Sequence, residues 1–253
     1  MLILLPPSEG KTPPARGPRL RPDALSFPEL RGTRSAVLER LIAVCAKDAS
    51  AMKVLGLGPT QREEIVRNRS ITTSPCGPAV DVYTGVLFEA LDAETLTTPQ
   101  RTRLNAHVAM GSALWGLVRP LDPIPAYRLS GDARLPVLGA VSTMWKEPVT
   151  AVLGASRGGI LDLRSEAYRF GVLPDRADVA VGRVLLERGG RRSVVSHHNK
   201  ATKGRAVRAL AMSRARLRTL DDVMGVLEAS GIRCELHDAT RGPARLDLVT
   251  RDL

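Results

Sequence analysis

The sequence begins with an apolar run, LILL, which is followed by PPSEGKT, a stretch that ends like a phosphate-binding loop. Its last three residues match the end of the motif G-x-x-x-x-G-K-[ST]. Leu5 occupies the position of the motif's first glycine, and the two prolines that follow have no backbone N–H to offer a phosphate. The stretch is therefore not expected to be a P-loop. Lys11 is still a cation just beyond a strand, where α/β proteins place ligand sites. An exposed lysine in a turn is the alternative.

The segment RPLDPIPAYR carries three prolines and has an arginine at each end, Arg119 and Arg128. Because proline restricts the chain, both guanidinium groups are held at low entropic cost. Each guanidinium group can donate two parallel hydrogen bonds, so the pair is suited to binding a phosphate or a carboxylate. An ion pair between Arg119 and Asp122 that merely holds the loop is the alternative.

Polar residues also follow the apolar segment GGILDL, which is expected to be a buried strand. Ser165 and Glu166 come shortly after Asp162, at the carboxyl end of this strand, and carboxylates are common catalytic residues at such positions. Glu166 is a candidate general base, or else an anchor for a basic neighbour. The candidates for catalysis are Lys11, Tyr83, Ser165 and Glu166.

A basic run surrounds Gly204 at the expected start of a helix. Cations at a helix N-terminus oppose the helix dipole, which indicates that an anion completes the site; exposure to solvent would also make the placement tolerable. The residues expected to bind an anion or nucleic acid are Lys11, Thr84, Gly85, Arg119, Arg128, Lys200, Lys203, Arg205, Gly56 and Gly58.

Residues 48–70 contain LGLG between two expected helices, a pattern like that of a helix-hairpin-helix element. Gly56 and Gly58 would let the hairpin approach a DNA phosphate, which its amides and the following helix N-terminus can bind without reading bases. An ordinary corner between helices is the alternative, and two glutamates beside the turn favour it. Three arginines lie nearby, at positions 62, 67 and 69.

The composition bounds the class of protein. A chain of 253 residues with 43% hydrophobic and only 3% aromatic residues predicts a substantial aliphatic core. The net charge of +11 favours a polyanionic partner, although an arginine-rich composition without a binding role explains it equally well. The apolar runs are too short for a membrane span or a signal peptide, so we expect a cytoplasmic protein without membrane contact. The three cysteines form no C-x-x-C pair, so we expect buried thiols and no structural zinc. The adjacent His197 and His198 would point to opposite faces of a strand and could not easily share a metal, so we expect no metal site, and we also expect no cofactor.

The pattern of elements predicts a single α/β domain over residues 1–253. Strands are expected at residues 2–5, 158–163, 232–236 and 244–250, and a β-hairpin is expected around Gly189-Gly190. Helical periodicity is evident at residues 34–46. We expect a mixed, mostly antiparallel sheet with surrounding helices.

The blocks LILLPPSEGKT, DVYTG, LWGLVRPLDPIPAYRL, ILDLRSEAY and S-x-x-x-K-x-x-K-G-R together resemble successive blocks of the YaaA family. They occur in the family's order and extend from residue 2 to about residue 210. The first block departs from the family's usual SPAKT by one added residue, and LGLG is unlike many relatives. The resemblance implies a single α/β domain with a basic cleft and a helix-hairpin-helix-like element.

Two functions follow from these observations. The resemblance implies a peroxide-stress protein that binds double-stranded or distorted DNA through its phosphate backbone and limits damage from iron-driven peroxide chemistry. The diverse polar residues in the same blocks favour an alternative, an enzyme acting on a nucleotide, nucleobase or other small anionic substrate. The sequence does not predict the oligomeric state.

Overall fold

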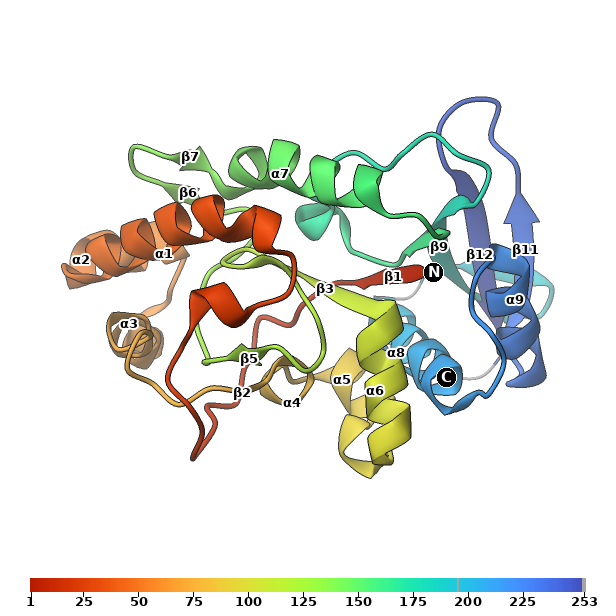
Figure 1. The fold of residues 1–253 in the computed structure, drawn as a ribbon, viewed down its shortest axis with the longest axis horizontal. Helices are drawn as coiled ribbons and strands as arrows, with labels where there is room; N and C mark the ends of the chain where they lie inside the picture. Colours follow the sequence, from red (N-terminus) through yellow and green to blue (C-terminus); the bar gives the residue numbers. More distant parts are fainter. Residues whose placement is uncertain (195, 252–253) are drawn as a thin grey trace.

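The computed structural model describes residues 1–194 and 196–251, and a mixed eight-stranded sheet lies at its centre (Figure 1). The strand order is β11-β12-β9-β8-β1-β3-β4, and β10 pairs with β9. The strands of this sheet are β1 (Leu2–Leu5), β3 (Val108–Ser112), β4 (Gly116–Val118), β8 (Ile160–Asp162), β9 (Val179–Arg188), β10 (Arg191–Ser193), β11 (Arg233–His237) and β12 (Ala244–Thr250). The short pairs are β2 (Gly77–Pro78) with β5 (Pro123–Ile124), and β6 (Arg134–Leu135) with β7 (Gly139–Ala140).

The predicted α/β class with a mixed sheet is confirmed, but the central strands run in a different direction from the one expected. The neighbours β12, β9, β8, β1 and β3 are all parallel, and antiparallel pairing is found in β3–β4, β9–β10 and β11–β12. Continuous apolar runs such as LILL are typical of strands buried on both faces, as in parallel sheets, whereas antiparallel strands commonly alternate, so the run agrees with the observed parallel pairing. The expected hairpin is confirmed, and Gly189 and Gly190 have φ of 55° and 74°, as its tight turn requires.

The connections that follow the adjacent parallel strands β1 and β8 lead to opposite sides of this strand pair. After β1 the chain next enters the large sheet at β3, on one side of β1, whereas after β8 it enters at β9, on the other side. In open α/β sheets, ligands bind beyond the carboxyl ends of strands at such a switch point. We call the two loops that meet here, residues 6–12 and 163–170, the β1–β8 junction.

Helices lie on both sides of the sheet. In Figure 1, α7 runs above the central strands, whereas α5, α6 and α8 lie below them. A Cβ at Gly204 of α8 would lie only 2.2 Å from the carbonyl oxygen of Leu87 in α5, so these helices approach closely. The helices are α1 (Arg31–Cys45), α2 (Asp48–Leu55), α3 (Arg62–Arg69), α4 (Ala79–Val82), α5 (Val86–Leu91), α6 (Thr98–His107), α7 (Val141–Ala155), α8 (Ser196–Met212) and α9 (Leu220–Ala229).

The start of α8 corrects the interpretation of the basic run. The helix begins at Ser196, so Lys203 and Arg205 lie well inside it and not at its N-terminus. Gly204 suggested a break because glycine is a poor helix former, but its missing side chain is what allows α8 to pack against α5. The helix-dipole argument for an anion at these residues therefore does not hold.

The core is aliphatic, as the composition predicts, with a few large aromatic side chains. Trp115 and Trp145 are fully buried, and Trp145 Nε1 donates a 2.8 Å hydrogen bond to the Ala113 carbonyl. The three cysteines are buried free thiols, as expected. Across residues 1–194 and 196–251, no helix combines the length and the apolar character needed to cross a membrane.

Candidate functional site

Lys11 lies in the first loop of the β1–β8 junction and is buried, with 9% of its surface exposed. Its Nζ donates hydrogen bonds to the carbonyls of Ser8 (2.8 Å) and Glu9 (3.2 Å). It also lies 4.3 Å from the centre of the Tyr127 ring and 5.2 Å from that of Tyr83. Burial lowers the pKa of Lys11 to about 7, partly offset by the nearby charge of Glu9. Both protonation states of Lys11 are therefore populated near neutral pH.

A chain of hydroxyl groups lies beside this lysine. Tyr83 and Tyr127 are buried, and their oxygens are 3.0 Å apart. The Tyr127 oxygen also lies 2.7 Å from Oγ of Ser112, which accepts a hydrogen bond from the Trp115 amide. Burial raises the pKa of Tyr83 to about 12 and raises that of Tyr127 well above its usual value. Both phenols therefore stay protonated and can donate hydrogen bonds.

Glu9 joins three loops around Lys11. One carboxylate oxygen forms a 2.8 Å ion pair with Nη1 of Arg128, and the other accepts a 2.6 Å hydrogen bond from the Tyr168 hydroxyl. Tyr168 belongs to the second loop of the junction, so this hydrogen bond connects the loops that follow β1 and β8. The Glu9 side chain is 46% exposed, so it remains accessible to solvent and to a competing anion.

Arg128 is fixed by a residue of α3. The Asn68 side chain donates a 2.8 Å hydrogen bond to the Arg128 carbonyl and accepts a 2.9 Å bond from its amide. The Arg128 Nε is buried and has no hydrogen-bond partner in the described chain. Since a buried unpaired donor is costly, this guanidinium is well suited to accept an anionic ligand.

The predicted residues Thr84 and Gly85 also belong to this site. The Thr84 amide donates a 3.0 Å hydrogen bond to Oγ of Ser8, whose hydroxyl hydrogen-bonds the Gly10 carbonyl at 2.5 Å. Gly85 has φ of 86° and directly precedes α5. The structure therefore brings together five of the predicted positions in one site: Lys11, Tyr83, Thr84, Gly85 and Arg128.

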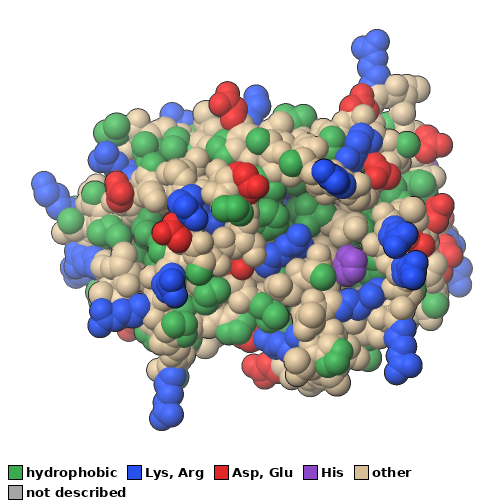
Figure 2. Space-filling model, viewed as in Figure 1, with side chains coloured by type: hydrophobic (Ala, Val, Ile, Leu, Met, Phe, Trp, Pro, Cys, Tyr) green, Lys and Arg blue, Asp and Glu red, His purple; other side chains and the backbone are tan. Residues whose placement is uncertain are grey.

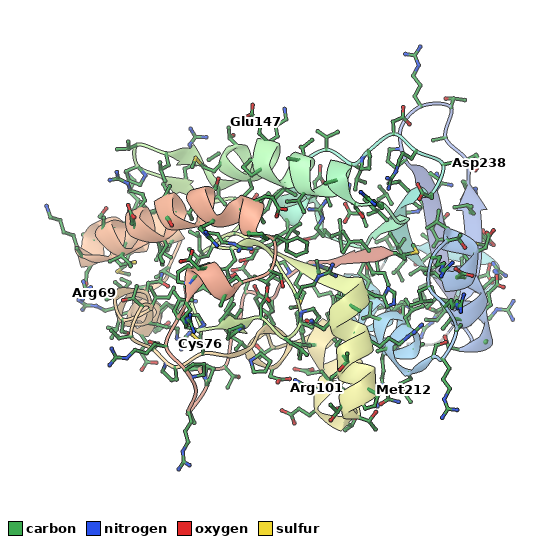
Figure 3. The ribbon with its side chains drawn as sticks, viewed as in Figure 1. Arg69, Cys76, Arg101, Glu147, Met212 and Asp238 are labelled. Atoms are coloured by element: carbon green, nitrogen blue, oxygen red, sulfur yellow. The ribbon has the colours of Figure 1, made fainter. Side chains whose placement is uncertain are left out.

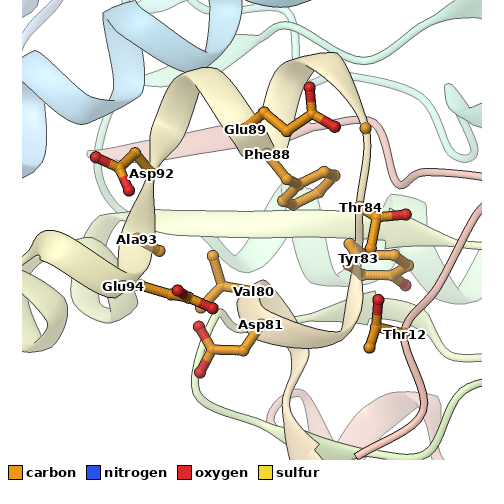
Figure 4. A pocket seen from close by; sticks show the side chains of 11 residues that line it. Thr12, Val80, Asp81, Tyr83, Thr84, Phe88, Glu89, Asp92, Ala93 and Glu94 are labelled. Atoms are coloured by element: carbon orange, nitrogen blue, oxygen red, sulfur yellow. The ribbon is translucent and has the colours of Figure 1, made fainter.

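Two cavities border this site, and their charges differ. The first, of about 540 Å³, is lined by Arg128, Gly56, Lys53, Arg134 and Asp132 among others, so cations outnumber acids there. Figure 4 shows the second, of about 470 Å³, where Tyr83 and Thr84 face a wall rich in carboxylates. Its acidic residues are Asp81, Glu89, Asp92 and Glu94. An anion is therefore expected on the Arg128 side.

A second group of charges lies at the carboxyl end of β8. Asp162 is fully buried and forms a two-pronged ion pair with Arg164. Lys203, from α8, is also buried, and burial lowers its pKa to about 8 while the charge of Asp162 acts in the opposite direction. The structure thus places Lys203 beside the second loop of the junction and away from Lys200 and Arg205, which are exposed.

The remaining predicted residues of these blocks lie apart from Lys11. Arg119 donates hydrogen bonds to the carbonyls of Ala106 and Val108, and its amide donates to Asp122, so it stabilises its own loop. Ser165 and Glu166 are exposed in the second loop of the junction.

The turn between α2 and α3 contains Gly56 in the left-handed conformation, with φ of 62°. The three arginines expected to assist DNA binding are each paired with a carboxylate of the same segment: Arg62 and Arg69 with Asp48, and Arg67 with Glu64. Arg69 is labelled beside α3 in Figure 3. These pairs reduce the free positive charge beside the turn.

Several residues of the site could not be identified from sequence patterns. Ser8 and Glu9 lie in the block LILLPPSEGKT and Ser112 lies outside the quoted blocks, but the roles of all three follow only from contacts between distant segments. Within the described ranges, one trio of side chains lies close enough to share a metal ion: Glu235, His237 and Asp247. Arginines already occupy two of these carboxylates, since Arg192 pairs with Glu235 and Arg183 with Asp247, so the trio is an ion-pair network.

The fold and the site together define an α/β protein with a candidate ligand site at the carboxyl ends of parallel strands. The family model described as Peroxide stress protein YaaA matches residues 1–234. The chain is 40% identical to a UPF0246 protein of Streptomyces coelicolor, over all of both chains. It is 42% identical to UPF0246 proteins of Corynebacterium glutamicum, over 93% of this chain and 95% of the relative, and of Corynebacterium efficiens, over 95% and 97%. This chain therefore belongs to the YaaA peroxide stress protein family.

Proposed function

We propose that this protein binds a small anionic substrate at the β1–β8 junction and that Lys11 transfers a proton to or from it. The observation that supports this most directly is the buried Lys11 amine, enclosed by two tyrosine rings and with its pKa lowered to about 7. A general acid or base is most effective when its pKa lies near the working pH. Perturbed ionisable groups of this kind cluster at functional sites.

The residues around Lys11 would bind the other groups of the substrate. Arg128 would bind the anionic group of the substrate, because its Nε is unpartnered in the described chain and Glu9 can give up its place on Nη1. The hydroxyl chain of Tyr83, Tyr127 and Ser112 uses two of its three protons between its own oxygens, so it would donate one hydrogen bond to an oxygen or nitrogen of the substrate. A nucleotide, a nucleobase or another small anion fits this combination of groups.

The binding test uses nucleoside 5′-monophosphates and free nucleobases as probes, with thermal shift and calorimetry as measurements. At least one probe should bind the wild type, and its affinity should fall at least tenfold in Lys11→Met and in Arg128→Met. Lys146→Met, an exposed substitution on α7, is the control and should bind like the wild type. Equal affinity of the wild type and both site variants, or no binding by any probe, would count against the proposal.

A test in cells connects the site to peroxide stress, the role that the family's name indicates. In a strain that lacks the native gene, the wild-type protein should restore survival in hydrogen peroxide, whereas Lys11→Met should not. Protein levels are measured by immunoblot so that a loss of protein is not mistaken for a loss of function. Full rescue by Lys11→Met at equal abundance would exclude a necessary role for this amine.

We infer a second function, contact with DNA phosphates, from a patch of exposed cations between the β9–β10 hairpin and α8. Arg188 and Arg191 face each other directly across the hairpin, a like-charge pairing that an anion would relieve. Burial and the charges of Arg205 and Arg188 lower the pKa of His198, so both arginines lie near this histidine. Lys200 is also exposed. In the described chain, no ion-pair partner is found for any of the four cations of this patch, which are Arg188, Arg191, Lys200 and Arg205.

The distribution of charge favours a local contact over a broad basic cleft. Figure 2 shows Lys and Arg side chains scattered over the visible face and interspersed with acidic ones. Replacing Arg188, Arg191 and Arg205 by alanine should weaken binding to a 20-base-pair duplex for every sequence. The slope of log affinity against log salt should fall by roughly 0.9 for each phosphate that the variant no longer neutralises. Arg62→Ala, which removes a paired arginine, is the control and should leave the slope unchanged.

A further inference from the structure

The charges at the end of β8 do not balance. Arg164 donates from Nε and Nη2 to the two oxygens of Asp162, both at 2.9 Å, and its Nη1 donates to the Phe170 carbonyl. Arg169 also approaches Asp162, at 3.7 Å. The single carboxylate is therefore already shared by two guanidinium groups before Lys203 is considered.

Lys203 is the third cation of this group, and only 7% of its surface is exposed. Its ammonium group makes no hydrogen bond and no ion pair with any described residue. The charges of Asp162 and Arg169 both influence its pKa, so both lie within electrostatic range of the amine. With Lys203 protonated, three cations and one carboxylate give the group a net charge of +2.

A buried, uncompensated positive charge is costly, and proteins normally pair or coordinate such groups. The backbone geometry maintains this situation, because the close contact of Gly204 with Leu87 holds the adjacent Lys203 in place. A bound oxyanion would supply both the missing negative charge and acceptors for the unused N–H groups. Arg169, whose side chain is 38% exposed, offers the solvent-facing part of such a site.

We propose that Lys203 and Arg169 bind an oxyanion group, a phosphate or a carboxylate, of a small molecule, and that the Arg164–Asp162 pair supports them. A small ligand fits better than a DNA duplex, because only 7% of the Lys203 surface is exposed, whereas Lys200 and Arg205 on the same helix are exposed. This site uses residues different from those of the Lys11 site and does not depend on Lys11 having a catalytic role. The Tyr168–Glu9 hydrogen bond places the two sites on the same junction.

The experiment measures binding of inorganic phosphate and of citrate, by calorimetry and thermal shift, at an ionic strength held constant with sodium chloride. The wild type should bind at least one of them saturably. Lys203→Met should weaken this binding at least tenfold, Lys203→Arg should keep it within about threefold, and Lys146→Met should leave it unchanged. Unaltered binding by Lys203→Met, or a thermal shift that chloride reproduces, would overturn the proposal.

A measurement on the wild type alone covers the case in which Lys203→Met does not fold. Acetylation of lysines by acetic anhydride is followed by peptide mass spectrometry, with and without the anion. Phosphate or citrate should protect Lys203 but not Lys200, whereas a DNA duplex should protect Lys200 only. Protection of Lys203 by the duplex but by neither small anion would refute the small-ligand assignment. Lys11→Met should retain the anion affinity, so failure of the proposed catalytic function would be seen separately.

Discussion

Lys11 and Lys203 are both buried lysines beside the β1–β8 junction, and they differ in what surrounds their ammonium groups. Lys11 has two carbonyl acceptors and two tyrosine rings. Lys203 has neither within the described chain, and the one nearby carboxylate is already shared by two arginines. Burial lowers the pKa of both amines, whereas the neighbours decide what each can do. These surroundings are the basis for the proposals that Lys11 transfers a proton and that Lys203 binds an anion.

The largest effect is expected from removing the carboxylate on the Lys203 side. Asp162→Ala leaves Arg164 buried without its partner, and breaking a buried ion pair in this way costs about 3–5 kcal/mol of unfolding free energy. Urea denaturation measures this loss of unfolding free energy. Adding Lys203→Met should recover part of the loss, because one uncompensated cation is removed. Asp247→Ala is the control and should cost less, since its partner Arg183 is 45% exposed. A double variant no more stable than Asp162→Ala would contradict the charge imbalance.

Two glycines, one next to each lysine, allow a second comparison. In Gly204→Ala the new methyl group would lie 2.2 Å from the Leu87 carbonyl oxygen, so α8 must shift away from α5, at a cost of about 1–3 kcal/mol. In Gly10→Ala it would meet Oγ1 of Thr84 at 2.9 Å. This oxygen belongs to a side chain that can rotate, so a smaller loss is expected. Thermal unfolding of both variants tests this order, and equal losses would show that the α5–α8 contact is more adaptable than the structure implies.

The pH dependence of stability should reveal both amines. The pKa of Lys11 is about 7 and that of Lys203 about 8, against 10.5 in an unfolded chain. Above pH 7 the unfolded state therefore binds more protons than the folded state, so each lysine makes stability rise with pH, by at most about 1.4 kcal/mol per pH unit. This contribution is lost as the pH falls through the folded pKa.

Urea denaturation between pH 7 and 9.5 measures this slope. Lys11→Met should reduce it from pH 7 upward, and Lys203→Met should reduce it about one pH unit higher. Lys146→Met is the matched control for an exposed lysine. A slope that neither site variant alters would mean that both amines keep ordinary pKa values.

The smallest effect is expected for the carboxylate on the Lys11 side. Glu9 is 46% exposed, and exposed ion pairs contribute little, so Glu9→Ala should lower the unfolding free energy by less than about 1 kcal/mol. Glu147→Ala, on the exposed surface of α7, is the comparison variant, and Glu147 is labelled in Figure 3. A loss as large as that of Asp162→Ala would show that Glu9 is a structural anchor and not a displaceable partner of Arg128.

Sequence patterns predicted those residues of the Lys11 site that lie in distinctive sequence motifs. Lys11 follows a buried strand, and Arg128 ends a stiff proline-rich loop, so local sequence marks both as candidates. Glu9 and Ser112 could not be found this way, because their roles arise from contacts with Arg128, Tyr168 and Tyr127, far away in the chain. The same limit applies to Arg62 and Arg69 of α3, which pair with Asp48 of α2, whereas the i,i+3 pair of Arg67 with Glu64 lies within one helix.

By itself, the sequence determined the α/β class, the buried strands, the Gly189-Gly190 hairpin and the exclusion of a P-loop, because each depends on short-range patterns of apolar residues, glycine and proline. Only the tertiary structure decided that β1 and β8 lie side by side and parallel, so that the loops following them meet. It also decided that α8 begins at Ser196 and buries Lys203 while Lys200 stays exposed. Burial depends on which surfaces pack together, and segments far apart in the chain supply those surfaces.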